Sequence, residues 1–323
     1  MMGTSAKYKQ GYKKIEKSCI EAQNEDIRLD FVWVDTCCID KTNSTELSEA
    51  INSMYLWYQE AEVCYVHLAD VPSKKDFTEG RWFTRGWTLQ ELIAPRKSVF
   101  FDENWNKIEY TAELQKKVSE VTGIPISILS KEKNLEDLSV AQRMSWAANR
   151  QTTRIEDHAN CLLGIFGVNM PLIYGEKEDA FIRLQEEIIR VSDDLSLFAW
   201  RSKNETGLLP RSPTALHGSR HIVHLNSFDS LYDPPTVNSR GVHLSVRFVG
   251  IGYRGLGLAI IDCKEMSGTG NETSIAIYVR DVSLKMRQFI RVQTDEFRPI
   301  DLRNSDSHNI LLGEYVSNTK TRP

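Results

Sequence analysis

One short segment, residues 80–95 (GRWFTRGWTLQELIAP), gathers the side chains of the chain best suited to chemistry. Two tryptophans and two arginines accompany a single glutamate there: Arg81, Trp82, Arg85, Trp87 and Glu91. Residues 87–94 have helical spacing, and the proline that follows ends the run. In one interpretation the indoles anchor the edge of a core and the arginines form solvated pairs with Glu91. In the other, Glu91 lies at the mouth of a cleft, where its neighbours poise a catalytic carboxylate.

The composition argues against several classes of function. The 323 residues are 41% hydrophobic, which is enough for two domains with separate cores. The net charge of −4 gives no reason to expect a nucleic acid or an anionic membrane surface as a partner. No apolar run reaches the roughly 18 residues of a membrane span, and the first residues lack the apolar stretch of a signal peptide. We therefore expect a cytoplasmic protein.

The six cysteines are scattered along the chain and form no CxxC pair, and the seven histidines do not cluster with them. We expect reduced, mostly buried thiols, no metal site and no bound cofactor. The adjacent Cys37 and Cys38 could include a nucleophile. Because no histidine lies near them in the sequence, their place in an apolar run favours packing instead.

The first hundred residues alternate between helix and strand patterns. Helical spacing covers residues 8–24 and 47–61, and three apolar runs rich in β-branched and aromatic residues cover 29–39, 63–68 and 98–102. Continuous apolar runs of this kind are typical of strands buried on both faces. The alternation predicts an α/β fold in which the three strands are parallel neighbours in one sheet.

Two aspartates accompany these predicted strands. Asp35 lies within the first, and Asp70 lies just past the end of the second. In open α/β sheets, polar residues at the carboxyl ends of strands line the ligand crevice. The alternative is that both aspartates cap neighbouring helices or loops.

The rest of the chain changes character twice. Helix patterns extend the α/β part to about residue 200, with Ser139 as a helix cap, a helix stop at Gly167 and a helix over 180–191. Residues 201–240 are rich in loops, and from residue 241 short apolar runs spaced by turns predict a small antiparallel β module. Residues 250–255 match G-x-G-x-x-G, but a strand pattern follows them, so we interpret them as a turn. The predicted domains are 1–200 and 201–323.

Three blocks resemble a known family. They begin FVWVDTCCIDKTNSTELSEA at residue 31, GRWFTRGWTLQELIAP at residue 80 and SVAQRMSWAANRQTTRIEDHANCLLGIFG at residue 139. Together they look like the HET (heterokaryon incompatibility) domain of filamentous fungi, over most of residues 10–200. The resemblance implies an effector of nonself recognition that triggers the death of fused, incompatible cells by associating with itself or with partner proteins.

HET domains are in turn thought to be distant relatives of TIR domains, which have a flavodoxin-like parallel sheet. In enzymatic TIR domains a glutamate on a helix beside the sheet cleaves NAD, and Glu91 resembles that residue. This resemblance implies an alternative function, an NAD glycohydrolase in which Glu91 stabilises an oxocarbenium-like ribose. Asp35, Arg85 and Trp87 would line its pocket, with Asp70, Arg81 and Trp82 nearby, and NAD would be a substrate rather than a cofactor.

The sequence departs from the family pattern in two ways. HET domains usually begin with a strand well before the first helix, whereas this chain starts almost at that helix. We therefore expect the first strand to be missing, with a gap or exposed edge beside residues 29–39, as in a truncated or inactive remnant. The second departure is Gly80, where the family more often has serine.

Overall fold

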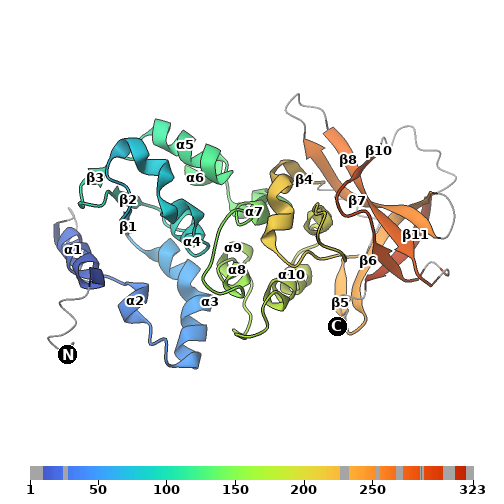
Figure 1. Cartoon of the computed structure of the whole chain (residues 1–323), viewed down its shortest axis with the longest axis horizontal. Helices are drawn as coiled ribbons and strands as arrows, with labels where there is room; N and C mark the ends of the chain where they lie inside the picture. Colours follow the sequence, from blue (N-terminus) through green and yellow to red (C-terminus); the bar gives the residue numbers. More distant parts are fainter. Residues whose placement is uncertain are drawn as a thin grey trace. The chain divides into compact units, whose positions relative to one another are not determined.

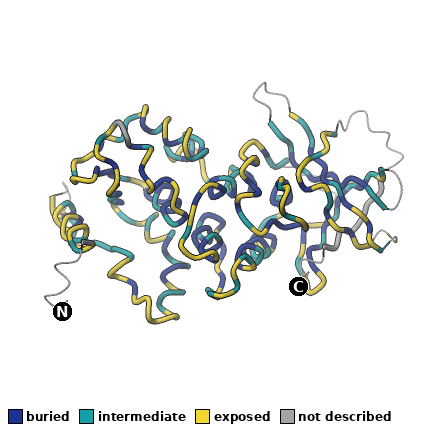
Figure 2. The backbone as a smooth tube through the Cα atoms, viewed as in Figure 1, coloured by how far each residue is buried: buried dark blue, intermediate teal, exposed yellow. Residues whose placement is uncertain are grey.

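The computed structural model describes residues 10–24, 28–225, 233–251, 255–266, 272–283, 285, 287–300 and 310–317 (Figure 1). The chain folds as two compact units, one up to Val121 and one from Thr122 onward. Figure 2 shows that α1 is mostly exposed, whereas buried positions are frequent in α7, α8 and α9 and in the long strands of the second unit. No described helix is both long and apolar enough to cross a membrane.

The first unit combines helices with a small sheet. Its α-helices are α1 (Gln10–Asn24), α2 (Asp35–Cys38), α3 (Ser44–Glu60), α4 (Thr88–Ile93) and α5 (Ala112–Thr122), which ends at the boundary. Two 3-10 segments, η2 (Lys74–Glu79) and η3 (Arg81–Thr84), precede α4, and the strands are β1 (Cys64–His67), β2 (Ser98–Phe101) and β3 (Lys107–Ile108). The helices predicted at 47–61 and 87–94 are thus confirmed, and the helix predicted at 8–24 is confirmed from residue 10 on.

The sheet of this unit is parallel in its central pair. Cys64 lies opposite Ser98 and His67 opposite Phe101 in the parallel ladder of β1 and β2, and β3 pairs antiparallel with β2. Two of the three predicted strands are therefore parallel neighbours, as expected. The mixed α/β class is confirmed, whereas a flavodoxin-like sheet of several parallel strands is not.

Aromatic side chains fill the core beside this sheet. The Phe77 ring lies edge-on to Phe83 and to Phe100, with centroid distances of 5.3 and 5.1 Å. Trp82 and Phe83 meet in the same manner at 5.0 Å. Because such edge-to-face pairs add to the gain from burying each ring, segment 77–83, which includes parts of η2 and η3, is fixed against the sheet.

The prediction of a strand over 29–39 is wrong. Residues 31–34 are extended but unpaired with any described strand, and α2 begins at Asp35. The Val34 carbonyl accepts the N–H groups of Cys37 and Cys38, at 3.1 and 2.9 Å, which commits the chain to a helical turn. An apolar run becomes a strand only where a neighbouring strand pairs with its backbone, and within the described residues β1 pairs with β2 alone.

The same run is only partly covered. Phe31 is 93% exposed. Trp33 instead packs edge-on against two rings of α3, Trp57 at 5.3 Å and Tyr58 at 5.8 Å. The apolar character that predicted a doubly buried strand is thus used for one-sided contact with a helix.

The second unit begins with short helices. They are α6 (Ile126–Leu129), η4 (Leu135–Asp137), α7 (Val140–Ser145), α8 (Asp157–Asn160), α9 (Leu163–Phe166), α10 (Asp179–Val191), η5 (Leu195–Phe198) and η6 (Pro213–His221). Ser139 caps α7, and Gly167 ends α9 in the left-handed conformation with φ = 64°, so both predicted helix limits are confirmed. The helix predicted at 180–191 is α10.

An antiparallel sheet forms the rest of this unit, which confirms the predicted β module. Its strands are β4 (Ile222–His224), β5 (Thr236–Asn238), β6 (Gly241–Gly250), β7 (Leu256–Met266), β8 (Glu272–Asp281), β9 (Phe289–Arg291), β10 (Arg298–Ile300) and β11 (Ile310–Ser317). The central order is β10-β8-β7-β6-β11. The G-x-G-x-x-G match joins β6 to β7 and is followed by a strand, as interpreted, although residues 252–254 lie outside the described part.

Residues 198–200 are bonded into the β module rather than forming a boundary. The buried Arg291 of β9 donates to the carbonyls of Phe198 and Trp200, and its guanidinium lies 4.1 Å from the Trp200 ring centroid. Ser219 donates to the Ala199 carbonyl at 2.9 Å. The compact units thus divide at residues 121 and 122, and the domains 1–200 and 201–323 stay a prediction about the chain's modular origin.

Replacing Gly167 by alanine should destabilise the protein by about 1–2 kcal/mol, because a Cβ is disfavoured in the left-handed conformation. Gly218 is the matched control, since a Cβ at either glycine would meet no atom within 4 Å and only Gly167 has positive φ. Urea unfolding of both alanine variants measures the difference. Equal stability of the two would contradict a conformational role for Gly167.

Candidate functional site

The predicted motif forms a turn that joins η3 to α4. The Thr88 hydroxyl reaches back to two carbonyls of this turn, that of Trp82 at 2.5 Å and that of Arg85 at 2.8 Å. Trp82 is only 7% exposed, and Phe83 beside it is 4% exposed. The buried Trp82 indole fixes the start of this connection, and the hydrogen bonds of Thr88 fix its end. Together they position the first turn of α4, which carries Glu91.

Glu91 accepts a hydrogen bond from the Trp82 indole, with Nε1 at 2.9 Å from Oε2. Tyr58 of α3, which packs against α4, lies close enough to interact electrostatically with this carboxylate. Burial raises the pKa of Glu91, and the charge of Asp35 raises it further, against the lowering effects of the indole, Lys14 and Arg85. The residue as a whole is only partly buried, whereas its carboxylate is desolvated.

The same environment acts on the groups around Glu91. Burial and the nearby Glu91 charge raise the pKa of Tyr58 above its usual range, and they do the same to Cys64 at the start of β1. Tyr58 and Cys64 therefore stay protonated, and a protonated Tyr58 can only donate to the carboxylate. Tyr58 and the Trp82 indole can together hold the Glu91 carboxylate in one orientation.

The other predicted residues divide into two groups. Asp35 opens α2 within electrostatic range of both Glu91 and Tyr58, and Arg85 acts on Glu91 as well. Asp70 and Arg81 instead bind each other: the Arg81 N–H donates to Oδ2 at 2.9 Å, and the side chains pair at 3.7 Å. The Arg81 side chain is 86% exposed, so this pair contributes little to stability.

Trp87 precedes α4 and is partly exposed, at the N-terminal boundary of the helix that carries Glu91. Gly80 lies on the Asp70 side, where a Cβ would stand 2.9 Å from the Val71 side chain. Sequence reasoning missed Tyr58 and Lys14 as neighbours of Glu91. Tyr58 was assigned to a helix face from its spacing alone, and no sequence signal linked Lys14 to the motif.

The vicinal cysteines are exposed, which contradicts the expectation that they are buried. Burial of the sulfur, the bond to Cys38 and nearby charges raise the pKa of Cys37 to about 11. The thiol therefore stays protonated at neutral pH, which disfavours a nucleophilic role. Across the described residues, no three His, Cys, Asp or Glu side chains are placed to hold a metal ion.

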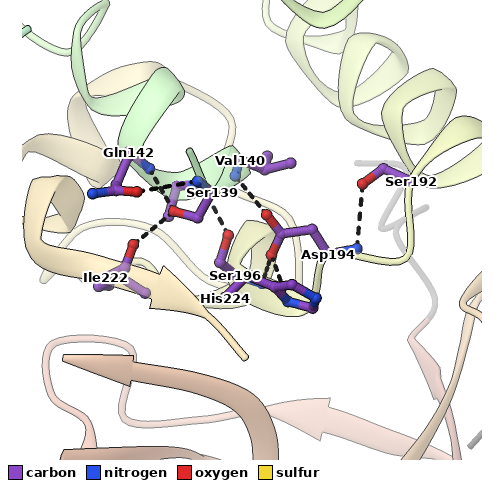
Figure 3. Close-up of polar contacts among 9 residues, drawn as sticks. Ser139, Val140, Gln142, Ser192, Asp194, Ser196, Ile222 and His224 are labelled. Carbon is purple, nitrogen blue, oxygen red and sulfur yellow. Dashed lines mark hydrogen bonds and ion pairs between the residues drawn. The ribbon is translucent and has the colours of Figure 1, made fainter. Parts of the chain in front are cut away.

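A second polar cluster, unforeseen from the sequence, lies in the second unit (Figure 3). The Asp194 carboxylate accepts the N–H groups of Val140 at 2.6 Å and Ser196 at 2.8 Å. His224 of β4 approaches it, with Nδ1 at 3.3 Å from Oδ1. Asp194 is thereby the meeting point of α7, η5 and β4.

Two family models match separate parts of the chain. The family described as "Heterokaryon incompatibility protein (HET)" matches residues 12–76, and a "Domain of unknown function (DUF8212)" matches residues 179–231, which include Asp194 and His224. "Vegetative incompatibility protein HET-E-1" of Podospora anserina is 50% identical over 192 residues. Residues 12–76 thus belong to a HET domain. No solved structure matches it significantly.

The relative is much longer than the aligned region. The alignment covers 56% of this chain but only 14% of the Podospora protein. Asp35, Tyr58 and Asp70 lie inside the segment that matches the HET family model, whereas Trp82 and Glu91 lie beyond it. The match to the HET family model therefore supports the chain's general class and leaves the role of Glu91 to its geometry.

Replacing Glu91 by glutamine should make the first unit's stability less sensitive to pH. The folded pKa of Glu91 is raised above its ordinary 4.5, so wild-type stability falls as the pH rises from 4.5 through the folded pKa. Glutamine keeps an acceptor for the Trp82 indole but carries no charge. The free energy of unfolding of the variant should therefore increase relative to that of the wild type as the pH rises. Urea unfolding between pH 4.5 and 8 measures this difference.

The exposed Glu62 provides the matched control, because Glu62→Gln removes the same charge from the surface of the same unit. A gain of equal size in both variants would show that net charge, rather than the buried position of Glu91, sets the pH dependence.

Proposed function

We propose that this chain acts as an effector of heterokaryon incompatibility, which triggers cell death on nonself recognition by associating with itself or with a partner protein. The observation that carries the proposal is the 50% identity over 192 residues to a protein named for vegetative incompatibility. The proposed setting is the cytoplasm, without nucleic acid or membrane as a partner.

An exposed apolar surface on the first unit supports a protein-binding role. Ile20 of α1, Phe31 and the α3 residues Leu56 and Trp57 are 43%, 93%, 50% and 38% exposed. Trp33 lies against Trp57 and connects the extended segment to α3. Exposed apolar side chains of this size are typical of interaction surfaces. We define Phe31, Leu56 and Trp57 as the apolar surface.

The test is expression in a filamentous fungus, with cell death scored in parallel with the size of the purified protein by light scattering. Phe31→Ser together with Leu56→Ser should reduce both cell death and association, because two exposed apolar anchors are lost. Val191→Ser is the control, since Val191 is 65% exposed in the second unit. If the double variant causes as much cell death as the Val191→Ser control, the apolar surface is not the effector surface.

A second candidate function is NAD cleavage by Glu91, in the manner of enzymatic TIR domains. The observation that favours it is the carboxylate held by the Trp82 indole, with Nε1 at 2.9 Å, and close to Tyr58. A fixed negative charge beside aromatic rings can stabilise the positive ribose that forms as nicotinamide leaves. This function depends on a TIR-like fold and on access of NAD to Glu91.

If Glu91 is catalytic, Glu91→Gln should lower nicotinamide release by ~10²-fold or more, because an amide cannot offset the developing charge. The assay is purified protein with NAD, with nicotinamide followed by chromatography, beside killing assays of the same variants. Glu62→Gln is again the control and should keep full activity. Killing by Glu91→Gln at the wild-type level, with no NAD loss in either protein, would reject the enzyme and leave the binding function.

A further inference from the structure

The first turn of α7 is satisfied by three different side chains. Its first three N–H groups, those of Val140, Ala141 and Gln142, bond to Asp194, Ser196 and Ser139 at 2.6, 3.0 and 3.1 Å. A helix leaves its first N–H groups without intrahelical partners. The six-residue helix thus obtains two of its three caps from η5, more than fifty positions along the chain.

Strand β4 is attached to the same turn at two points (Figure 3). The Ser139 hydroxyl donates to the Ile222 carbonyl at 2.6 Å, and His224 Nδ1 lies 3.3 Å from the Asp194 carboxylate. Only 23% of the His224 side chain and 10% of the Asp194 side chain are exposed. The Nδ1 atom is buried and makes no hydrogen bond of ordinary geometry among the described residues, so its contact with the carboxylate is an ion pair that forms when the imidazole is protonated.

The charges that act on His224 are acidic. Asp194 faces it from η5, Asp193 from the preceding loop and Asp262 from β7. Arg247 of β6 is paired with Asp262 at 3.5 Å, and α7 presents backbone N–H groups at this point. The neighbour of His224 across the ladder is Cys263, which burial keeps protonated. A proton on His224 is thus met by negative charge.

We propose that the contact between Asp194 and His224 is a pH-sensitive clamp, which fastens β4 to the N-terminal turn of α7 and tightens when His224 takes up a proton. Strand β4 has only three residues and pairs with β7 over those three positions alone. So short a strand gains few ladder bonds, and its attachment depends on the clamp.

The clamp has a definite pH range. The contact with Asp194 raises the pKa of His224 above its ordinary 6.5. The clamp therefore contributes its full stability below pH 6.5, and this contribution is lost as the pH rises through the pKa that His224 has in the folded protein. Burial favours the protonated form of Asp194, but bonds from His224, Val140 and Ser196 lower its pKa on balance below 3.8. In acid, the clamp therefore loses its stability as the pH falls below 3.8 and through the lowered pKa of Asp194 in the folded protein. Both groups are charged between these limits.

Direct titration of the histidine tests the electrostatic half of the clamp. The imidazole resonances of His224, followed by NMR across pH 5 to 9, should give a higher pKa in the wild type than in Asp194→Asn. Asparagine keeps an acceptor for Val140 but loses the charge. The same pKa in both proteins would overturn the proposal.

Hydrogen exchange tests the mechanical half. The Leu225 N–H, which donates to the Asp262 carbonyl at 3.1 Å, reports whether β4 stays on β7. Its protection factor, corrected for intrinsic exchange, should fall between pH 6 and 8.5 in the wild type and stay level in His224→Gln. Each unit by which the pKa of His224 differs between the attached and the detached state of β4 corresponds to a tenfold change in the equilibrium constant for detachment.

The control for this experiment is His217→Gln, because His217 is an exposed histidine of η6 in the same unit. It should keep the wild-type fall in protection. A wild-type protection factor that does not change with pH, or a fall in His224→Gln as large as in the wild type, would overturn the clamp. If His224→Gln fails to fold, the wild-type pH profile and the Asp194→Asn titration still decide the question.

Discussion

A backbone N–H group in a protein interior must find an acceptor, and this constraint governs a chain whose helices are so short. Six of the described α-helices, α2, α4, α6, α7, α8 and α9, have six residues or fewer. In such a helix few N–H groups find an acceptor within the helix itself. Side chains from elsewhere must complete it, and these contacts decide which segments meet.

Buried carboxylates meet this constraint at two places in the second unit. Asp194 serves the backbone of α7 and of η5 with one carboxylate. Glu156 plays the same part for a turn, accepting from the N–H groups of Gly175 and Lys177 at 2.7 and 3.2 Å, which lowers its pKa. Glu91 differs, because its donors are side chains and burial raises its pKa. A carboxylate that no backbone group requires is the one most available for function.

Local patterns in the sequence predicted the elements that depend on neighbours along the chain. Helical spacing located α3 and α10, and Ser139 and Gly167 gave two helix limits, because caps and left-handed turns are properties of a few adjacent residues. The run 29–39 failed because a strand is defined by its partner, and residues 31–34 have no described strand beside them. Likewise, Glu91 was identified from its motif, while its proximity to Tyr58 required the packing of α3 on α4.

Gly80 has a consequence for how sequences of this family can vary. A side chain at this position would meet Val71, which is fully buried and whose carbonyl accepts the Glu103 N–H at 3.0 Å while its own N–H bonds to Leu68. Val71 cannot retreat without disturbing the end of β1 and the loop after β2. Positions 71 and 80 thus share one fixed volume, and a serine at 80 belongs with a smaller residue at 71. Pairwise covariation between these two positions is the evolutionary trace that such a shared volume leaves.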